Sequence, residues 1–132
     1  MRRAIALGCV AVLAACGGDE GSAEELCAAV RADRSTPAVF SGFDPTDTSR
    51  AVEQLREARV TLGELRDAAP SELRDDIDLE IAYVQALLER LEDLGGAEPE
   101  SVVQAVREVT DAHPDVADAA ARLDAWSDES CP

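Results

Sequence analysis

Residues 72–94 read ELRDDIDLEIAYVQALLERLEDL, and this stretch decides the fold class. Its apolar side chains recur every three or four residues, which places them on one face of an α-helix. They are Leu73, Ile77, Ile81, Val84, Leu88 and Leu91. Pro70 and Ser71 come before the run, and Gly95 and Gly96 come after it, as is typical of the two ends of a helix. The pattern therefore predicts one long amphipathic helix.

The rest of the chain has a helical composition, dominated by alanine, leucine, glutamate and arginine. Prolines and capping residues set the boundaries of four further predicted helices, and Ser22 and Glu25 form a capping box at the start of the first. The predicted ranges are 22–33, 45–69, 99–112 and 114–128. Only a tight turn separates the two longest helices, so they should lie antiparallel. We expect an all-α, antiparallel bundle of about five helices, with no second domain.

Some residues carry more specific expectations. Gly63 lies inside the predicted helix 45–69, where glycine is costly, and we predict a close helix crossing there. The valines of the predicted helix 99–112 are expected to face the core: Val102, Val103, Val106 and Val109. The loop 34–43 contains Val39, Phe40 and Phe43, which we predict to pack under the helices as a plug.

The chain begins MRRAIALGCVAVLAAC, in which Arg2 and Arg3 precede an apolar stretch over residues 4–15. This stretch is shorter than the roughly 20 residues of a membrane-spanning helix and fits the apolar region of a signal peptide. Leu13, Ala14, Ala15 and Cys16 then resemble the lipobox of bacterial lipoproteins. In that family the cysteine thiol receives diacylglycerol and a peptidase cuts before the cysteine.

The resemblance implies a signal peptide over 1–15, lipidation at Cys16, a flexible glycine-rich tether over 16–21 and a helical domain over 22–132. It also implies a lipid-anchored protein on the extracytoplasmic face of the cell membrane, which it contacts through the acyl chains on Cys16. Two alternatives remain at this point. Cys9 follows a looser version of the motif, and an ordinary signal peptidase could cut near Ala15 and leave Cys16 as a free thiol.

Once Cys9 has left with the signal peptide and Cys16 is lipidated, Cys27 and Cys131 remain as a pair. In an exported protein such a pair is most simply a disulfide, which here would staple the first helix to the end of the last. Two free thiols are the alternative. A metal site is a poorer interpretation, because two cysteines and the single histidine, His113, do not make a zinc site.

The chain is strongly acidic, with a formal net charge of −16 and no lysine among its basic residues. Such a charge repels nucleic acids and anionic membrane surfaces, so we expect no nucleic-acid partner. The densest run of acids comprises Asp75, Asp76, Asp78 and Glu80. Calcium binding is one interpretation, but the run lacks the spacing and the glycine of an EF-hand loop. We expect a solvated helix face, with Asp78 paired to Arg74.

Two other candidates have structural interpretations that we prefer. His113 could act as a general base, but it precedes a helix-starting proline and is expected to be a surface-turn residue. Arg122 and Trp126 could form a cation–π pair, or Trp126 could anchor a partner, but packing at the core edge is the preferred role. Glycine-rich phosphate loops, zinc-protease motifs and nucleophile elbows are absent from the sequence.

These observations favour a non-catalytic cell-envelope interaction or structural protein that needs no cofactor and no metal, with an envelope protein as a possible but unidentified partner. The alternative is an extracytoplasmic binding module for a small ligand or a cation. We do not expect an enzyme. The mature chain also resembles, by layout alone, the small helical lipoproteins of Gram-positive-type cell surfaces, which share no activity.

Overall fold

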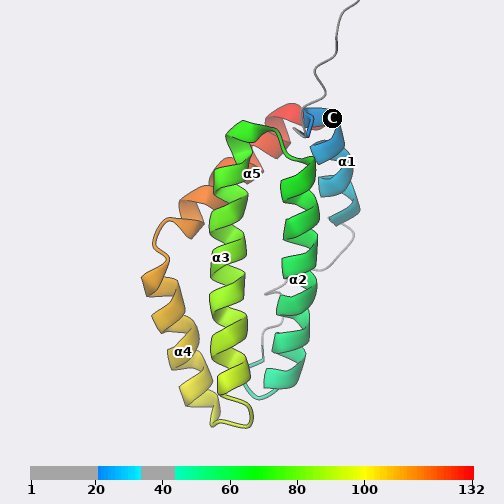
Figure 1. Cartoon of the computed structure of the whole chain (residues 1–132). Helices are drawn as coiled ribbons and strands as arrows, with labels where there is room; N and C mark the ends of the chain where they lie inside the picture. Colours follow the sequence, from blue (N-terminus) through cyan, green and yellow to red (C-terminus); the bar gives the residue numbers. More distant parts are fainter. Residues whose placement is uncertain (1–20, 34–43) are drawn as a thin grey trace, which may run out of the picture.

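A computed structural model describes residues 21–33 and 44–132. Within these ranges the protein consists of five α-helices and contains no strand (Figure 1). They are α1 (Ala23–Asp33), α2 (Thr48–Ala68), α3 (Ser71–Asp93), α4 (Pro99–Ala112) and α5 (Val116–Ser130). The predicted fold class, an all-α antiparallel bundle of five helices with one disulfide, is confirmed.

Two helices begin later than the sequence suggested. We predicted α2 from residue 45, but Asp44, Pro45 and Thr46 form a turn, in which the Asp44 carboxylate accepts a hydrogen bond from the Thr46 amide at 2.8 Å. Asp47 is the residue that caps the helix, because its carboxylate accepts from the Arg50 amide at 3.0 Å. Helix α5 also starts late, two residues after Pro114.

Helix α3 is the centre of the bundle. It forms an antiparallel hairpin with α2 along its whole length, while α4 packs along one half of it and α5 along the other (Figure 1). The short helix α1 packs against α2 and α5 at the end where the chain terminates. Most faces of α3 are therefore covered by other helices, which explains why its apolar pattern is the clearest in the sequence.

The core divides into two clusters, which define two halves of the molecule. The disulfide half contains α1, α5 and the adjoining parts of α2 and α3, and the far half contains α4 with the remaining parts of α2 and α3. Buried in the disulfide half are Leu26, Ala69, Leu73 and Ile77, with Val30, Leu65, Ile81, Leu123 and Trp126 packed against them. Buried in the far half are Ala51, Leu55, Ala58, Val84, Leu87, Leu88, Leu91 and Val102, with Val52, Leu62, Tyr83, Val106 and Val109 against them.

Two core expectations were wrong. Val103 is 42% exposed, because it lies one residue, or about 100° of helix rotation, beyond the fully buried Val102. Gly63 does not mark a helix crossing: among the described residues, no atom lies within 4 Å of the position that its Cβ would take. The predicted plug of Val39, Phe40 and Phe43 lies outside the described residues.

Candidate functional site

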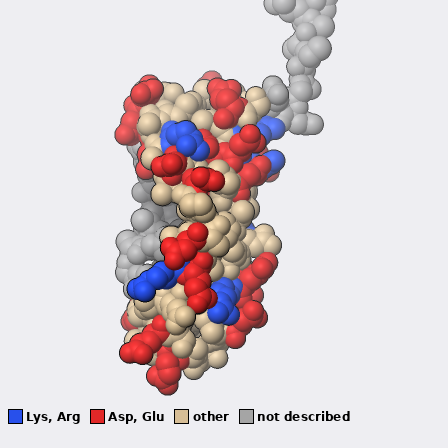
Figure 2. Space-filling view, turned by 90° about the vertical axis from the view of Figure 1, so that its left-hand side faces the viewer, with Lys and Arg blue, Asp and Glu red and all other residues tan. Residues whose placement is uncertain are grey.

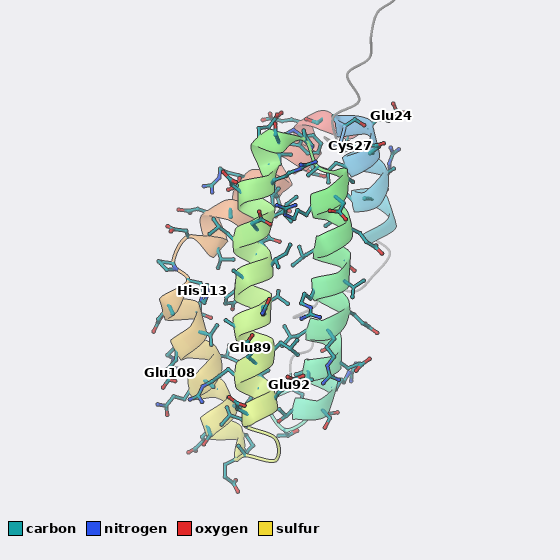
Figure 3. The ribbon with its side chains drawn as sticks, viewed as in Figure 1. Glu24, Cys27, Glu89, Glu92, Glu108 and His113 are labelled. Atoms are coloured by element: carbon teal, nitrogen blue, oxygen red, sulfur yellow. A yellow bond between two sulfur atoms is a disulfide. The ribbon has the colours of Figure 1, made fainter. Side chains whose placement is uncertain are left out.

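Cys27 of α1 and Cys131, directly after α5, form the predicted disulfide, with a Cα–Cα distance of 5.4 Å (Figure 3). The bond joins residues 104 positions apart in the sequence. It therefore ties the first helix of the domain to the end of the last one. Cys27 is buried, and its neighbour Leu26 belongs to the core cluster of the disulfide half.

Local interactions hold α1 in place for this bond. The predicted capping box is confirmed: the Ser22 amide donates to the Glu25 carboxylate at 3.1 Å, and the Glu25 amide donates to the Ser22 hydroxyl at 3.2 Å. One turn beyond Cys27, the Arg31 guanidinium donates to the Cys27 carbonyl oxygen at 3.2 Å. The start of α1 is thus fixed by its own side chains as well as by the disulfide.

Gly21 is a packing residue, not the end of a flexible tether as we had expected. A Cβ built on this residue would overlap the carbonyl group of Ala68 and would lie 2.8 Å from the backbone nitrogen of Ala69. Only a residue without a side chain can approach the end of α2 so closely. Gly21 therefore packs as part of the helical domain.

The acidic run on α3 is engaged in ion pairs with other helices. Asp76 receives two nitrogens of Arg122 from α5, with contacts of 2.5 and 3.0 Å. These hydrogen bonds hold the pKa of the Asp76 carboxyl below its usual range and raise that of Arg122. The run is not simply a solvated face, because part of it fastens α3 to its neighbours.

Asp78 pairs with Arg66 of α2, at 2.5 Å to one guanidinium nitrogen and 3.1 Å to another. Hydrogen bonding to Asp78 raises the pKa of Arg66. We had predicted Arg74 as the partner, from its position on the same helix. In the structure the Arg74 guanidinium donates to the Ala69 carbonyl oxygen at 3.0 Å, at the turn between α2 and α3.

Sequence reasoning missed the pairs that join helices in the far half. Arg56 of α2 contacts Glu92 of α3 at 2.6 Å, and Arg90 of α3 contacts Glu108 of α4 at 3.4 Å. Figure 3 labels both glutamates, Glu92 on α3 and Glu108 on α4. Each interface of α3 with α2, α4 and α5 thus has at least one arginine–carboxylate pair. Only the three-dimensional arrangement reveals them, because the partners are far apart in the sequence.

His113 ends α4 and faces α3 (Figure 3). Its Nδ1 lies 2.8 Å from the Val109 carbonyl oxygen, so this nitrogen carries the proton and donates, and the ring lies edge-on to Tyr83 with centroids 5.8 Å apart. The Thr110 hydroxyl donates to the Val106 carbonyl oxygen at 2.8 Å. It must therefore accept from the Tyr83 hydroxyl, which lies 2.9 Å away. These contacts give His113 a structural role at the junction of α4 and α5.

The contacts of Arg122 and Trp126 agree with the structural interpretation. Arg122 is engaged by Asp76, as described above, and Trp126 packs against the core cluster of the disulfide half. Trp126 is partly buried. Packing at the edge of the core, as expected from the sequence, accounts for its position.

A concavity on the described part of the surface is the candidate for a ligand site. A shallow, solvent-open concavity of about 560 Å³ lies on the outer face of α4, lined by Pro99, Glu100, Val103, Gln104, Arg107, Glu108 and Asp111. Within residues 21–33 and 44–132, no three histidine, cysteine or acidic side chains gather as they would around a metal ion. In the same ranges, no helix is both long and apolar enough to cross a membrane.

The predicted lipidation site, Cys16, and the competing Cys9 lie outside the described residues, as does the predicted signal peptide over 1–15. The disulfide residues Cys27 and Cys131 are therefore the predicted site residues that the structure brings together. Comparison of the chain with protein-family models, with curated proteins and with solved structures gave no match.

Proposed function

We propose that this protein is an extracytoplasmic lipoprotein, anchored to the cell membrane through acyl chains on Cys16, with a non-catalytic interaction or structural role in the cell envelope. The observation that carries the proposal is the disulfide between Cys27 and Cys131. Disulfides form and persist in oxidising compartments outside the cytoplasm. This agrees with the predicted export signal and the lipobox-like residues 13–16.

The non-catalytic role is supported by what the polar side chains do. The candidates that the sequence offered for chemistry are used in structural contacts: Asp76 binds Arg122, Asp78 binds Arg66, and His113 closes α4. Catalytic groups need a cleft in which a substrate can approach them. The concavity on α4 is shallow, and Asp76, Asp78 and His113 are not among the residues that line it.

Mass spectrometry of the mature N-terminal peptide tests the anchor. The peptide should begin at Cys16 and carry a diacylglyceryl group. Cys16→Ala should leave the protein unprocessed or release it from the membrane, and Cys9→Ala is the matched control that should change neither processing nor location. An unmodified N-terminus in the wild-type protein would refute the lipoprotein assignment.

A photo-crosslinking residue is the right probe for an envelope partner, because the chain contains no lysine for amine-reactive crosslinkers. Val103 of α4 and Val60 of α2 are exposed and suit the insertion of such a residue on two different faces. We expect one position to capture an envelope protein in intact cells and the other to capture much less of it. Equal, unselective capture at both positions would contradict a specific partner.

Calcium titration separates this proposal from the alternative of a cation-binding module. Since Asp76 and Asp78 are bonded to arginines, we expect binding no tighter than millimolar, comparable to weak extracellular calcium sites. Tight, stoichiometric binding in a calorimetric titration would favour the alternative.

A further inference from the structure

The chain is fixed to one end of the domain from Gly21 onward. Gly21 packs against the backbone of Ala68 and Ala69, Ser22 and Glu25 form the capping box, and Cys27 is bonded to Cys131. All of these contacts lie at the end of the bundle where α1 begins and the chain terminates (Figure 1). The point at which the anchor joins the domain is therefore set by packing.

The link from this point to the membrane is short compared with the domain. From Cys16 to Gly21 there are five peptide steps, which span about 18 Å at most when fully extended. Helix α3 has 23 residues and rises about 35 Å along the length of the bundle. The anchored end must stay near the bilayer, whereas the opposite end can lie far from it.

The charge of the domain opposes its lying flat on an anionic bilayer. On the face shown in Figure 2, acidic side chains extend from one end of the molecule to the other, with single arginines among them. The chain as a whole carries a formal net charge of −16. Tilting the domain toward anionic lipids would bring more of this acidic surface close to the headgroups, where like charges repel. The upright orientation keeps most of the acids away from the bilayer.

We propose that the domain stands on its disulfide end at the outer leaflet, with the turn 94–98 between α3 and α4 directed away from the membrane. This rests on the lipid anchor proposed above. The bilayer holds the acyl chains and its anionic headgroups repel the acidic surface of the domain. The packing of the domain fixes the point at which the anchor joins it. The far half is then the part of the molecule that meets other components of the envelope.

Energy transfer to labelled lipid measures this orientation, and the lysine-free chain permits a matched pair of labelling sites. Asp93→Lys and Glu129→Lys each replace an exposed acid in or next to the last turn of a helix, at opposite ends of the domain. A cation is favourable there, so both variants should fold. The lipidated full-length variants are labelled with an amine-reactive donor and reconstituted into phosphatidylglycerol vesicles containing an acceptor-labelled lipid. Wild type treated in the same way gives the background from the α-amino group.

We expect transfer from position 129 to exceed transfer from position 93 by about two-fold or more, since α3 alone separates the ends by about 35 Å. Inserting ten glycine and serine residues before Gly21 should narrow this difference. Flotation with the vesicles reports the anchor independently. Protein that floats but shows equal transfer from both positions would overturn the orientation alone, as would a difference that the insertion leaves unchanged. Protein that fails to float would overturn the anchor and the orientation together.

Discussion

In the disulfide half of the molecule, α1, α2, α3 and α5 share a small buried cluster, and a covalent bond joins two of these helices. In the far half, α2, α3 and α4 share a larger cluster in which leucines of α3 interlock with those of α2. The far half contains no cysteine. Its helices are held by apolar packing, by the ion pairs of Arg56 and Arg90, and by the hydrogen bond between the Tyr83 and Thr110 hydroxyls.

The difference follows from the helices that each half must hold. Helix α1 has 11 residues, which is too few for a stable isolated helix, and it adds Leu26 and Val30 to the core. Helix α4 is longer and adds Val102, with Val106 and Val109 packed beside it. A covalent staple is thus found where apolar packing is thinnest. The predictions below test this relation.

Removal of the disulfide should have one of the two largest effects. Loop closure in the unfolded chain gives a nominal stabilisation of about 4.7 kcal/mol for a loop of about 100 residues. We expect Cys27→Ser combined with Cys131→Ser to cost less than this, because a compact denatured state already restricts the chain. Urea unfolding, read by circular dichroism, measures the loss.

Hydrogen exchange then locates the effect of removing the bond. Amides of α1 and of the end of α5 should lose protection, while those in the part of α3 that packs against α4 should keep most of theirs. If α4 lost as much protection as α1, the two halves would not be stabilised in different ways.

Truncation of a core leucine in the far half is expected to have an effect of the same order. Leu87 is 1% exposed, and Leu87→Ala should destabilise the protein by about 2–5 kcal/mol through lost burial and the cavity left behind. Val103→Ala is the control, because this side chain is 42% exposed and its loss should change stability by less than about 0.5 kcal/mol. Similar denaturation midpoints for the two variants would refute the dependence of the far half on packing.

The sequence predicted those features that depend on local pattern. The period of apolar residues in 72–94, the capping box at Ser22 and the prolines located five helices to within a few residues. The disulfide could be predicted by elimination, since the predicted export and lipidation would leave only Cys27 and Cys131 as a pair. These inferences needed no knowledge of how the helices face one another.

Apart from the late starts of α2 and α5 and the exposure of Val103, the errors concern contacts between helices. Asp78 was assigned a partner on its own helix, whereas its partner Arg66 lies on α2. Gly63 was interpreted as a crossing and Gly21 as part of a flexible tether, but Gly21 is the glycine that approaches another backbone closely. Periodicity gives the position of a residue around its helix, and it does not give the rotation or the neighbours of that helix.

Gly63→Ala should stabilise the protein, and it tests how tightly α2 is packed where the two halves meet. Gly63 lies between Leu62, which packs in the far half, and Leu65, which packs in the disulfide half. Alanine has the higher helix propensity, and the described residues leave room for its Cβ, so we expect a gain of about 0.5–1 kcal/mol. Gly21→Ala is the matched substitution and should destabilise, because its Cβ would overlap Ala68. A loss of stability from Gly63→Ala in thermal unfolding would show that the middle of α2 is more tightly packed.

The smallest expected effect, and the only one that depends on pH, is that of Asp76→Asn in the disulfide half. The pKa of Asp76 is lower in the folded protein than in the unfolded chain, because Arg122 donates hydrogen bonds to the carboxylate. Its contribution to stability is therefore fully present above the unfolded pKa of about 3.9 and is lost as the pH falls through the folded pKa. The free energies of unfolding of wild type and Asp76→Asn should differ at pH 7 and converge below pH 4.

Glu108→Gln is the control in the far half. The Asp76 side chain is 15% exposed and that of Glu108 is 52% exposed, so water and salt screen the Arg90–Glu108 pair more strongly. We expect a smaller change from Glu108→Gln at pH 7. A difference between wild type and Asp76→Asn that stays constant down to the lowest pH would mean that the side-chain shape of Asp76, and not its charge, joins α3 to α5.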